Sequence, residues 1–169
     1  MKVFPVHVAG RATTERAGVE RRPPMIRRPM DRAGGAILSA VRIVVSFLFL
    51  CHGVAILFGA LGGAYGRPGS TAPVGAWPQW WAGLIHLVAG GLVLVGLFTV
   101  PAALLSSGEM AFAYFTVHQP LGVLPLQNHG ELAALYAWVF LLIAVLGPGP
   151  YALDSLLRRR HRLPAPRKE

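Results

Sequence analysis

Charged residues are almost missing from the middle of this 169-residue chain. Only four lie between residues 43 and 157, namely Arg67, Glu109, Glu131 and Asp154. Charged residues make up 14% of the whole sequence, against roughly 25% in soluble domains, and hydrophobic residues make up 54%. So long a stretch with four charges cannot stay in solution, which excludes an ordinary soluble domain.

Acidic residues are also few, and all but one of the 16 basic residues that outnumber them lie toward the two ends of the chain, the exception being Arg67. Nine of these basic residues lie at or before Arg42, and six lie at or after Arg158. A nucleic-acid-binding protein carries its basic side chains on a folded face. Here they flank apolar segments, where they hold helix ends at the membrane surface and attract anionic lipid headgroups. We therefore expect a lipid bilayer as partner and no nucleic acid.

Cysteine and clustered metal ligands are scarce as well. Cys51 is the only cysteine, which excludes an internal disulfide and a CxxC motif. The six histidines form no HExxH motif and no close pair, so the sequence predicts no dedicated metal site. One histidine from each of two helices, such as His52 and His86, would suffice to hold a haem, and that alternative stays open.

Four apolar segments are close to the length of about 20 residues that a helix needs to cross a bilayer. They cover residues 36–61, 78–98, 101–118 and 130–146. A tight turn at Thr99-Val100-Pro101 joins the second segment to the third, and the breaker run from Gly147 to Pro150 ends the fourth. Glycines along the first two segments allow close helix packing in lipid. The prediction is an all-α integral membrane protein folded as a four-helix bundle.

The positive-inside rule places both basic ends in the cytoplasm, which requires an even number of spans. Residues 1–35 are then a disordered basic cytoplasmic tail, residues 36–157 the transmembrane domain, and residues 158–169 a second basic tail. The first thirty residues hold no apolar stretch long enough for a signal peptide. Met25 and Met30 leave open that translation starts later than Met1.

Ionisable side chains inside these segments are the candidates for function, because a charged carboxylate at the centre of a helix costs about 3 kcal/mol on insertion scales. Glu109 lies halfway along the third segment, and His52 lies near the middle of the first. We predict Glu109 as a proton-exchanging group with His52 as its partner. The competing interpretation is structural, with a protonated Glu109 that hydrogen-bonds to His52 or to a helix backbone.

The other candidates lie closer to the outer surface. His86 is about one and a half turns below the outer end of the second segment, and a structural role is the stronger expectation for it alone. His118, His129 and Glu131 fall at or just below the outer surface. Nine residues separate Glu109 from His118, which places them on opposite faces of an ideal helix. Both can line one narrow pocket only if the helix is distorted.

An ordered set of short motifs resembles the DoxX family of membrane proteins, over about residues 42–154. The first span contributes Arg42, His52-Gly53 and Leu57-Phe58-Gly59, and the second contributes Gly90-Gly91 and Gly96-Leu97-Phe98-Thr99. The remaining motifs are Gly108-Glu109-Met110-Ala111, Ala113-Tyr114-Phe115, His118, Asn128, Gly130-Glu131-Leu132-Ala133, Gly147-Pro148-Gly149 and Asp154.

The resemblance implies a four-helix protein of the bacterial inner membrane. The family takes its name from a subunit associated with a terminal quinol oxidase and thiosulfate oxidation. Some relatives look like anchors that gather soluble thiol and superoxide-handling enzymes. Two positions depart from the family pattern: His86 stands where many members have a carboxylate, and Val54-Ala55-Ile56 stands where many have a lysine.

We therefore expect a redox-linked membrane subunit that binds a quinone-like lipid, whether or not it is itself catalytic. Glu109 and His52 are the predicted proton-exchanging residues, and Arg42, His86, His118, Asn128 and Glu131 are the further ligand-binding candidates. One alternative is a non-catalytic scaffold that recruits soluble redox enzymes. Another is a small transporter for protons or a hydrophobic solute.

Overall fold

The structure is a computed structural model that describes residues 27–161. The expected basic tail before Arg27, with the alternative start at Met25, and the last residues of the C-terminal tail lie outside the described residues. Every regular element from 27 to 161 is a helix, which confirms the all-α class. The five α-helices are α1 (Arg27–Phe58), α2 (Gln79–Val95), α3 (Thr99–Ala113), α4 (Glu131–Leu146) and α5 (Leu153–His161).

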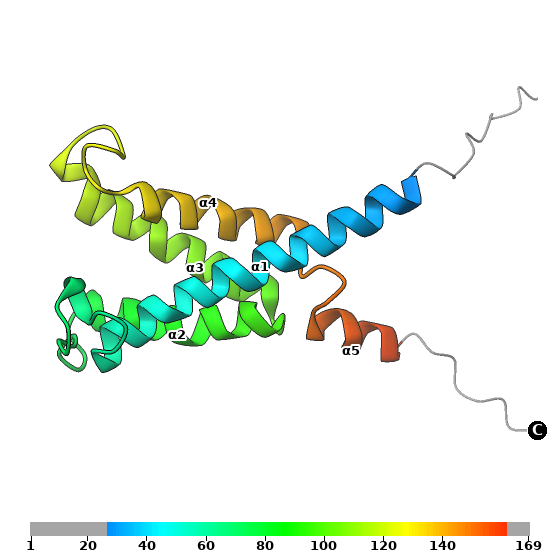
Figure 1. Cartoon of the computed structure of the whole chain (residues 1–169), viewed down its shortest axis with the longest axis horizontal. Helices are drawn as coiled ribbons and strands as arrows, with labels where there is room; N and C mark the ends of the chain where they lie inside the picture. Colours follow the sequence, from blue (N-terminus) through cyan, green and yellow to red (C-terminus); the bar gives the residue numbers. More distant parts are fainter. Residues whose placement is uncertain (1–26, 162–169) are drawn as a thin grey trace, which may run out of the picture.

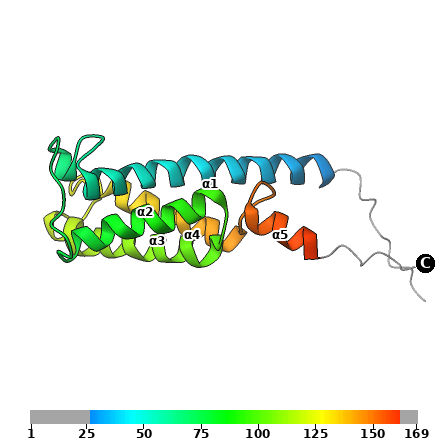
Figure 2. The ribbon, with the colours of Figure 1, turned by 90° about the horizontal axis from the view of Figure 1, so that it is seen from below.

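The first four helices pack lengthwise against one another. α2 lies between α1 and α3, α4 packs on α3, and α1 crosses α4 (Figures 1 and 2). The connection before α2 and the connection before α4 gather at one end, which we call the loop end (Figure 1). The turn between α2 and α3 lies at the opposite end with α5, and we call this the α5 end (Figure 1).

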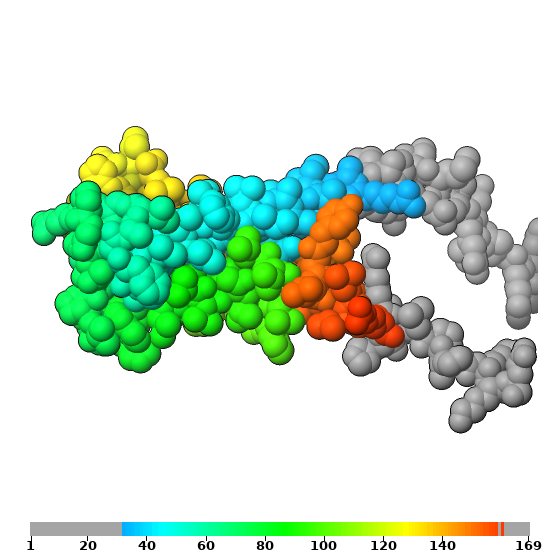
Figure 3. Space-filling model, turned by 60° about the horizontal axis from the view of Figure 1, so that its bottom comes forward, coloured from blue at the N-terminus to red at the C-terminus, as the bar shows by residue number. Residues whose placement is uncertain are grey.

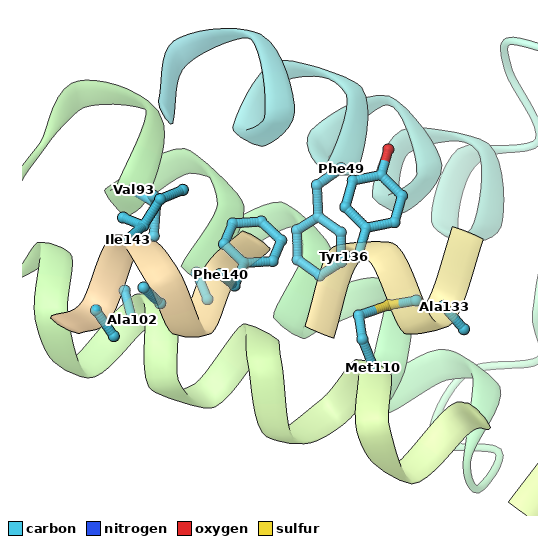
Figure 4. Packing of buried hydrophobic residues seen from close by; sticks show 11 residues of the cluster. Phe49, Val93, Ala102, Met110, Ala133, Tyr136, Phe140 and Ile143 are labelled. Carbon is cyan, nitrogen blue, oxygen red and sulfur yellow. The ribbon is translucent and has the colours of Figure 1, made fainter. Parts of the chain in front are cut away.

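The core forms where side chains from α1, α2, α3 and α4 meet (Figure 4). Phe49 of α1 is fully buried, and its ring centroid lies 4.7 Å from that of Phe140 and 5.5 Å from that of Tyr136, both on α4. Val93 and Ile143 are also fully buried. Close contact between such side chains supplies the dispersion attraction that holds helices together where no water is displaced.

Two glycines let α1 approach α2 closely. A Cβ atom added at Gly53 would lie 2.8 Å from the backbone nitrogen of Leu87, and one added at Gly83 would lie 2.8 Å from Cγ2 of Ile56. A larger residue at Gly53 would collide with the backbone of α2, and one at Gly83 would have to displace the side chains of Ile56 and Leu57. The expectation that small residues mark the packing faces therefore holds for this pair of helices.

The helix boundaries differ from the predicted segments at two places. α1 begins at Arg27 instead of near residue 36, so its first turns extend the helix beyond the apolar segment. The turn between α2 and α3 lies at residues 96–98, earlier than predicted, because Gly96 adopts a left-handed conformation with φ of 74° that ends α2. Pro101 then lies in the first turn of α3, where its missing N–H is tolerated.

Two helical segments are long and apolar enough to cross a membrane, Arg32–Phe58 and Thr99–Leu121. The second includes a π-helical turn, η2 (Tyr114–His118), and a 3-10 turn, η3 (Gln119–Leu121), that continue α3. α2 and α4 are apolar helices of 17 and 16 residues. α5 was not predicted, since its nine residues are too short and too polar for a span.

Candidate functional site

A cavity of about 370 Å³ lies toward the loop end, between α1, α2 and α3. It is closed at one side by the 3-10 turn η1 (Ala64–Gly66) and by η2. Most of its wall is apolar, with Ile56, Ala82 and Met110 among the lining residues. Its polar lining residues are His52, Tyr65, Gln79, His86, Glu109, Thr116 and His118.

Glu109 and His86 form a direct pair in the wall of this cavity. Nε2 of His86 lies 3.0 Å from Oε2 of Glu109, and both side chains are about nine-tenths buried. The partner predicted for Glu109 was His52, but the structure pairs it with His86. Mid-helix backbone groups are already hydrogen-bonded, so a polar side chain at this depth needs another side chain as its partner.

The surroundings of His86 indicate where its proton lies. Its Nδ1 atom is buried and has no hydrogen-bond partner among the described residues. The ring packs on Phe49, with centroids 4.0 Å apart. A doubly protonated ring would bury an unpaired N–H of a charged group, which is strongly unfavourable. The neutral ring with its proton on Nε2 avoids this, so that Nε2 donates to Oε2 of Glu109 and leaves Oε1 of Glu109 for another partner.

His52 also lines the cavity, but it lies at its open side. Its ring centroid is 6.4 Å from that of His86 and 6.1 Å from that of Tyr136, and the residue is exposed. His86 uses Nε2 for Glu109, and its unpartnered Nδ1 is buried, so neither nitrogen is accessible to a haem iron. Among residues 27–161, no group of three His, Cys, Asp or Glu side chains is placed to hold a metal ion.

A change of helix type brings His118 into the same cavity as Glu109. Residues 114–118 form a π-helical turn, which has more residues per turn than an α-helix. Each residue in it advances by a smaller angle, so the nine-residue separation no longer places the two side chains on opposite faces. Both residues line the cavity. Single π-helical turns often occur at functional sites.

Three other candidates do not line this cavity. Asn128 is fully buried in the loop before α4, where it hydrogen-bonds within the loop. Glu131 is exposed in the first turn of α4, where a negative charge stabilises the helix N-terminus. Arg42 lies at the α5 end, near the opposite end of the helices.

Arg42 is 1% exposed and donates hydrogen bonds to three backbone carbonyls. Nη1 donates to Val93 and Leu94, with 2.6 Å to the oxygen of Leu94, and Nη2 donates to Tyr151 at 2.7 Å. Val93 and Leu94 are in the last turn of α2, where carbonyls have no partner inside the helix. A cation there also offsets the negative end of the helix dipole. These contacts make Arg42 a cap for α2.

Asp154 caps α3 from the other side of the same turn, a contact that sequence reasoning missed. Its carboxylate accepts hydrogen bonds from the backbone nitrogens of Phe98 and Thr99 at 3.0 and 2.9 Å, and from the Thr99 hydroxyl at 2.9 Å. Burial alone would raise the pKa of Asp154, but the hydrogen bonds from Thr99 and Phe98 outweigh it and hold that pKa below its ordinary value. Figure 3 shows α5 and the segment before it lying across the end of the molecule.

A second hollow, of about 540 Å³, lies between α2 and α3. It is larger than the first, but its lining is apolar throughout, with Trp81, Val88 and Leu105 among the residues. It offers no side chain that could orient a polar ligand or exchange a proton. The smaller cavity with the Glu109–His86 pair is therefore the candidate site.

Comparison with known proteins places the chain in a family. The DoxX family model matches residues 37–119. The chain is also 40% identical over 121 residues to an uncharacterized protein of Haemophilus influenzae, an alignment that covers 70% of this chain and 88% of that relative. The chain belongs to the DoxX family. No solved structure gives a significant match.

Family membership makes this DoxX chain a membrane protein that contacts the lipid bilayer. Every residue that lines the candidate cavity lies between positions 52 and 118, inside the region that matches the DoxX model. The Arg42 cap lies inside it too, whereas Asp154, Asn128 and Glu131 lie beyond it. The cavity is therefore lined wholly by residues of the region that matches the DoxX family.

Proposed function

We propose that this DoxX protein is a redox-linked subunit of the bacterial inner membrane that binds a quinone-type headgroup in the candidate cavity. The observation that carries the proposal is the Glu109–His86 pair in the wall of an otherwise largely apolar cavity. Small-molecule sites typically combine apolar walls with a few convergent polar groups, in volumes of roughly 300–1,000 Å³. A planar ring with oxygen substituents fits such a lining.

The proposal places α1 to α4 across the bilayer, with the loop end outside and both termini in the cytoplasm. Large apolar side chains that are exposed on these helices support it, because lipid would cover them. Examples are Val44 at 56%, Trp138 at 72% and Val145 at 76% exposure. The basic residues Arg158 and Arg160 lie on α5, as the positive-inside rule requires of a cytoplasmic end.

Labelling of single cysteines tests this topology in a Cys51→Ala background. We expect Arg67→Cys to react with a membrane-impermeant maleimide in intact cells with an opened outer membrane. Arg158→Cys should react only after the inner membrane is permeabilised. The reverse pattern, or labelling of both sites in intact cells, would overturn the orientation.

Proton exchange at the site follows from the neutral form of the pair. With Nε2–H of His86 bound to Oε2, a protonated Glu109 carries its hydrogen on Oε1 and can donate it to a ligand carbonyl. The ionised form can instead accept a hydrogen from a ligand hydroxyl. His52 at the open side of the cavity offers a second group that can pass a proton on. A bound quinone would supply the two-electron chemistry, and a partner redox enzyme would donate or accept these electrons.

Substitution of Glu109 by Gln tests this function, because Gln keeps an acceptor for His86 but cannot exchange a proton. We expect binding of a short-chain ubiquinone analogue to purified protein in nanodiscs to weaken by about 10- to 100-fold, the value of a hydrogen bond to an ionisable group. The fold should survive the change.

Glu131→Gln is the matched control, since it removes a carboxylate outside the cavity. The affinity of Glu131→Gln for the ubiquinone analogue should equal that of the wild type. Equal affinities for wild type and Glu109→Gln, with both proteins folded, would rule out the assigned role of Glu109.

A further inference from the structure

His118 is held in one tautomer by the loop that precedes α4. Its Nδ1 atom lies 3.1 Å from the backbone oxygen of Asn128. A carbonyl oxygen can only accept a hydrogen bond, so Nδ1 must carry the proton. In the neutral ring Nε2 then has a free lone pair and acts as an acceptor. No described residue donates a hydrogen bond to this nitrogen.

The carbonyl that fixes His118 is itself held firmly. Asn128 is fully buried; its Nδ2 donates to the oxygen of Gly122 at 2.8 Å, and its Oδ1 accepts from the nitrogen of Gly130 at 2.8 Å. Gly130 leaves the space that this arrangement needs, because a Cβ there would lie 2.7 Å from Oδ1 of Asn128 and 2.8 Å from Cβ of His118. These contacts hold the backbone carbonyl of Asn128 in the position where it contacts Nδ1 of His118.

The π-helical turn places this fixed ring in the wall of the cavity. The other polar groups of the lining fall into three kinds. His52, Tyr65 and Gln79 carry groups that can donate or accept, and His86 is bound to Glu109. The Thr116 hydroxyl donates to the backbone oxygen of Phe112 at 2.7 Å, so it is left as an acceptor, as the ring of His118 is.

We propose that His118 is a fixed hydrogen-bond acceptor for a ligand hydroxyl, so that the cavity prefers the reduced, hydroxyl-bearing quinol over the quinone. This inference rests on the proposed function and names the form of the ligand. A quinone carbonyl can only accept a hydrogen bond, so it cannot form one with the lone pair of Nε2. A quinol hydroxyl donates to Nε2 and forms a hydrogen bond.

Glu109 on α3 and His118 on η2 belong to different turns of one continuous helical segment and line the same cavity. A ligand with oxygens on opposite carbons of one ring can therefore meet both side chains. One hydroxyl would donate to His118, and the other would contact Oε1 of Glu109.

Nitrogen NMR of protein labelled with ¹⁵N-histidine tests the fixed tautomer without any ligand. The signals of His118 are identified as those lost in His118→Gln. We expect Nδ1 to show the shift of a protonated nitrogen and Nε2 that of an unprotonated one at neutral pH. Protonation on Nε2 alone would overturn the proposal.

Binding of quinol and quinone to the wild-type protein, measured under argon, tests the ligand preference. We expect a short-chain quinol to bind about tenfold more tightly than its quinone and its dimethyl ether, the value of one net hydrogen bond. His118→Leu should lose this preference while its affinity for the quinone stays within a factor of two. Glu131→Gln should keep the preference.

The outcomes separate this inference from the function on which it rests. If both forms bind with equal affinity, the role of His118 is wrong and the proposed site survives. If neither form binds to folded wild-type protein, the proposed function fails, and the ligand assigned to His118 fails with it.

Discussion

The two ends of the helices both hold buried polar side chains, but they use them differently. At the α5 end, Arg42 donates to three carbonyls and leaves only its Nε without a partner among the described residues, and Asp154 accepts two hydrogen bonds from backbone nitrogens and one from the Thr99 hydroxyl. At the cavity, His86 and Glu109 have one hydrogen bond between them and further donor or acceptor capacity unused. Buried polar side chains therefore occur both at the helix caps and at the proposed site, and the hydrogen-bond partners of these side chains distinguish the two.

The difference follows from where each group lies on its helix. The last carbonyls of α2 and the first N–H groups of α3 have no partners inside their helices. A cation on the former and an anion on the latter satisfy these groups and oppose the helix dipoles. Around Glu109 the backbone is satisfied within the helix, so its side chain can pair only with another side chain or with a ligand.

The largest effect should come from removing the cap at the α5 end. Arg42→Leu removes three hydrogen bonds to backbone carbonyls, of which that of Val93 keeps the nitrogen of Gly96 as a donor. At about 1–3 kcal/mol for each carbonyl left without a donor, we expect unfolding to become easier by roughly 3 kcal/mol. Chemical denaturation in micelles measures this change. The variant should bind a quinone analogue normally per folded molecule, because Arg42 does not line the cavity.

Arg158→Leu is the control, because that arginine is exposed on α5 and should change stability by less than about 0.5 kcal/mol. A loss of ligand affinity in folded Arg42→Leu protein would break the division between the two ends. Arg42 would then belong to the ligand site, as the sequence suggested.

A smaller and pH-dependent effect is expected at Asp154. Asp154→Asn loses the contacts to Thr99 and should destabilise the fold by about 1–2 kcal/mol at pH 7. Since the folded-state pKa of Asp154 lies below its unfolded value, its contribution is fully present above the unfolded pKa, about 3.9, and is lost as the pH falls through the folded pKa.

The stability difference between wild type and Asp154→Asn should therefore shrink as the pH falls below about 4. Thermal unfolding of both proteins from pH 7 to pH 3 measures it. A difference that stays constant over this range would mean that the carboxylate does not cap α3.

Much of the fold could be predicted from the sequence because each apolar segment carries its own boundary signals. α4 was expected from Gly130 to Leu146 and is found from Glu131 to Leu146, since glycines stand on both sides of it. The start of α1 could not be predicted in the same way. Residues 27–35 include four charged residues and two glycines, so they belong to the helix without belonging to an apolar segment.

The site could be predicted only in part. The depth of Glu109, His52 and His86 follows from their positions, and all three line the cavity. The pairing of Glu109 with His86 depends on how α2 lies against α3, which hydropathy does not encode. The π-helical turn that brings in His118 has no known signal in the sequence, and the Arg42 and Asp154 caps join residues more than 50 positions apart.

Photoaffinity labelling with a diazirine-bearing quinone analogue tests the central claim most directly. The protein is labelled in nanodiscs, and the modified peptides are mapped by mass spectrometry. We predict labels within residues 52–56, 79–86 and 109–118, with competition by unlabelled quinol. Labels confined to the apolar hollow between α2 and α3, around Val88 and Leu105, or to the α5 end around Arg42, would contradict the claim that the cavity with the Glu109–His86 pair is the ligand site.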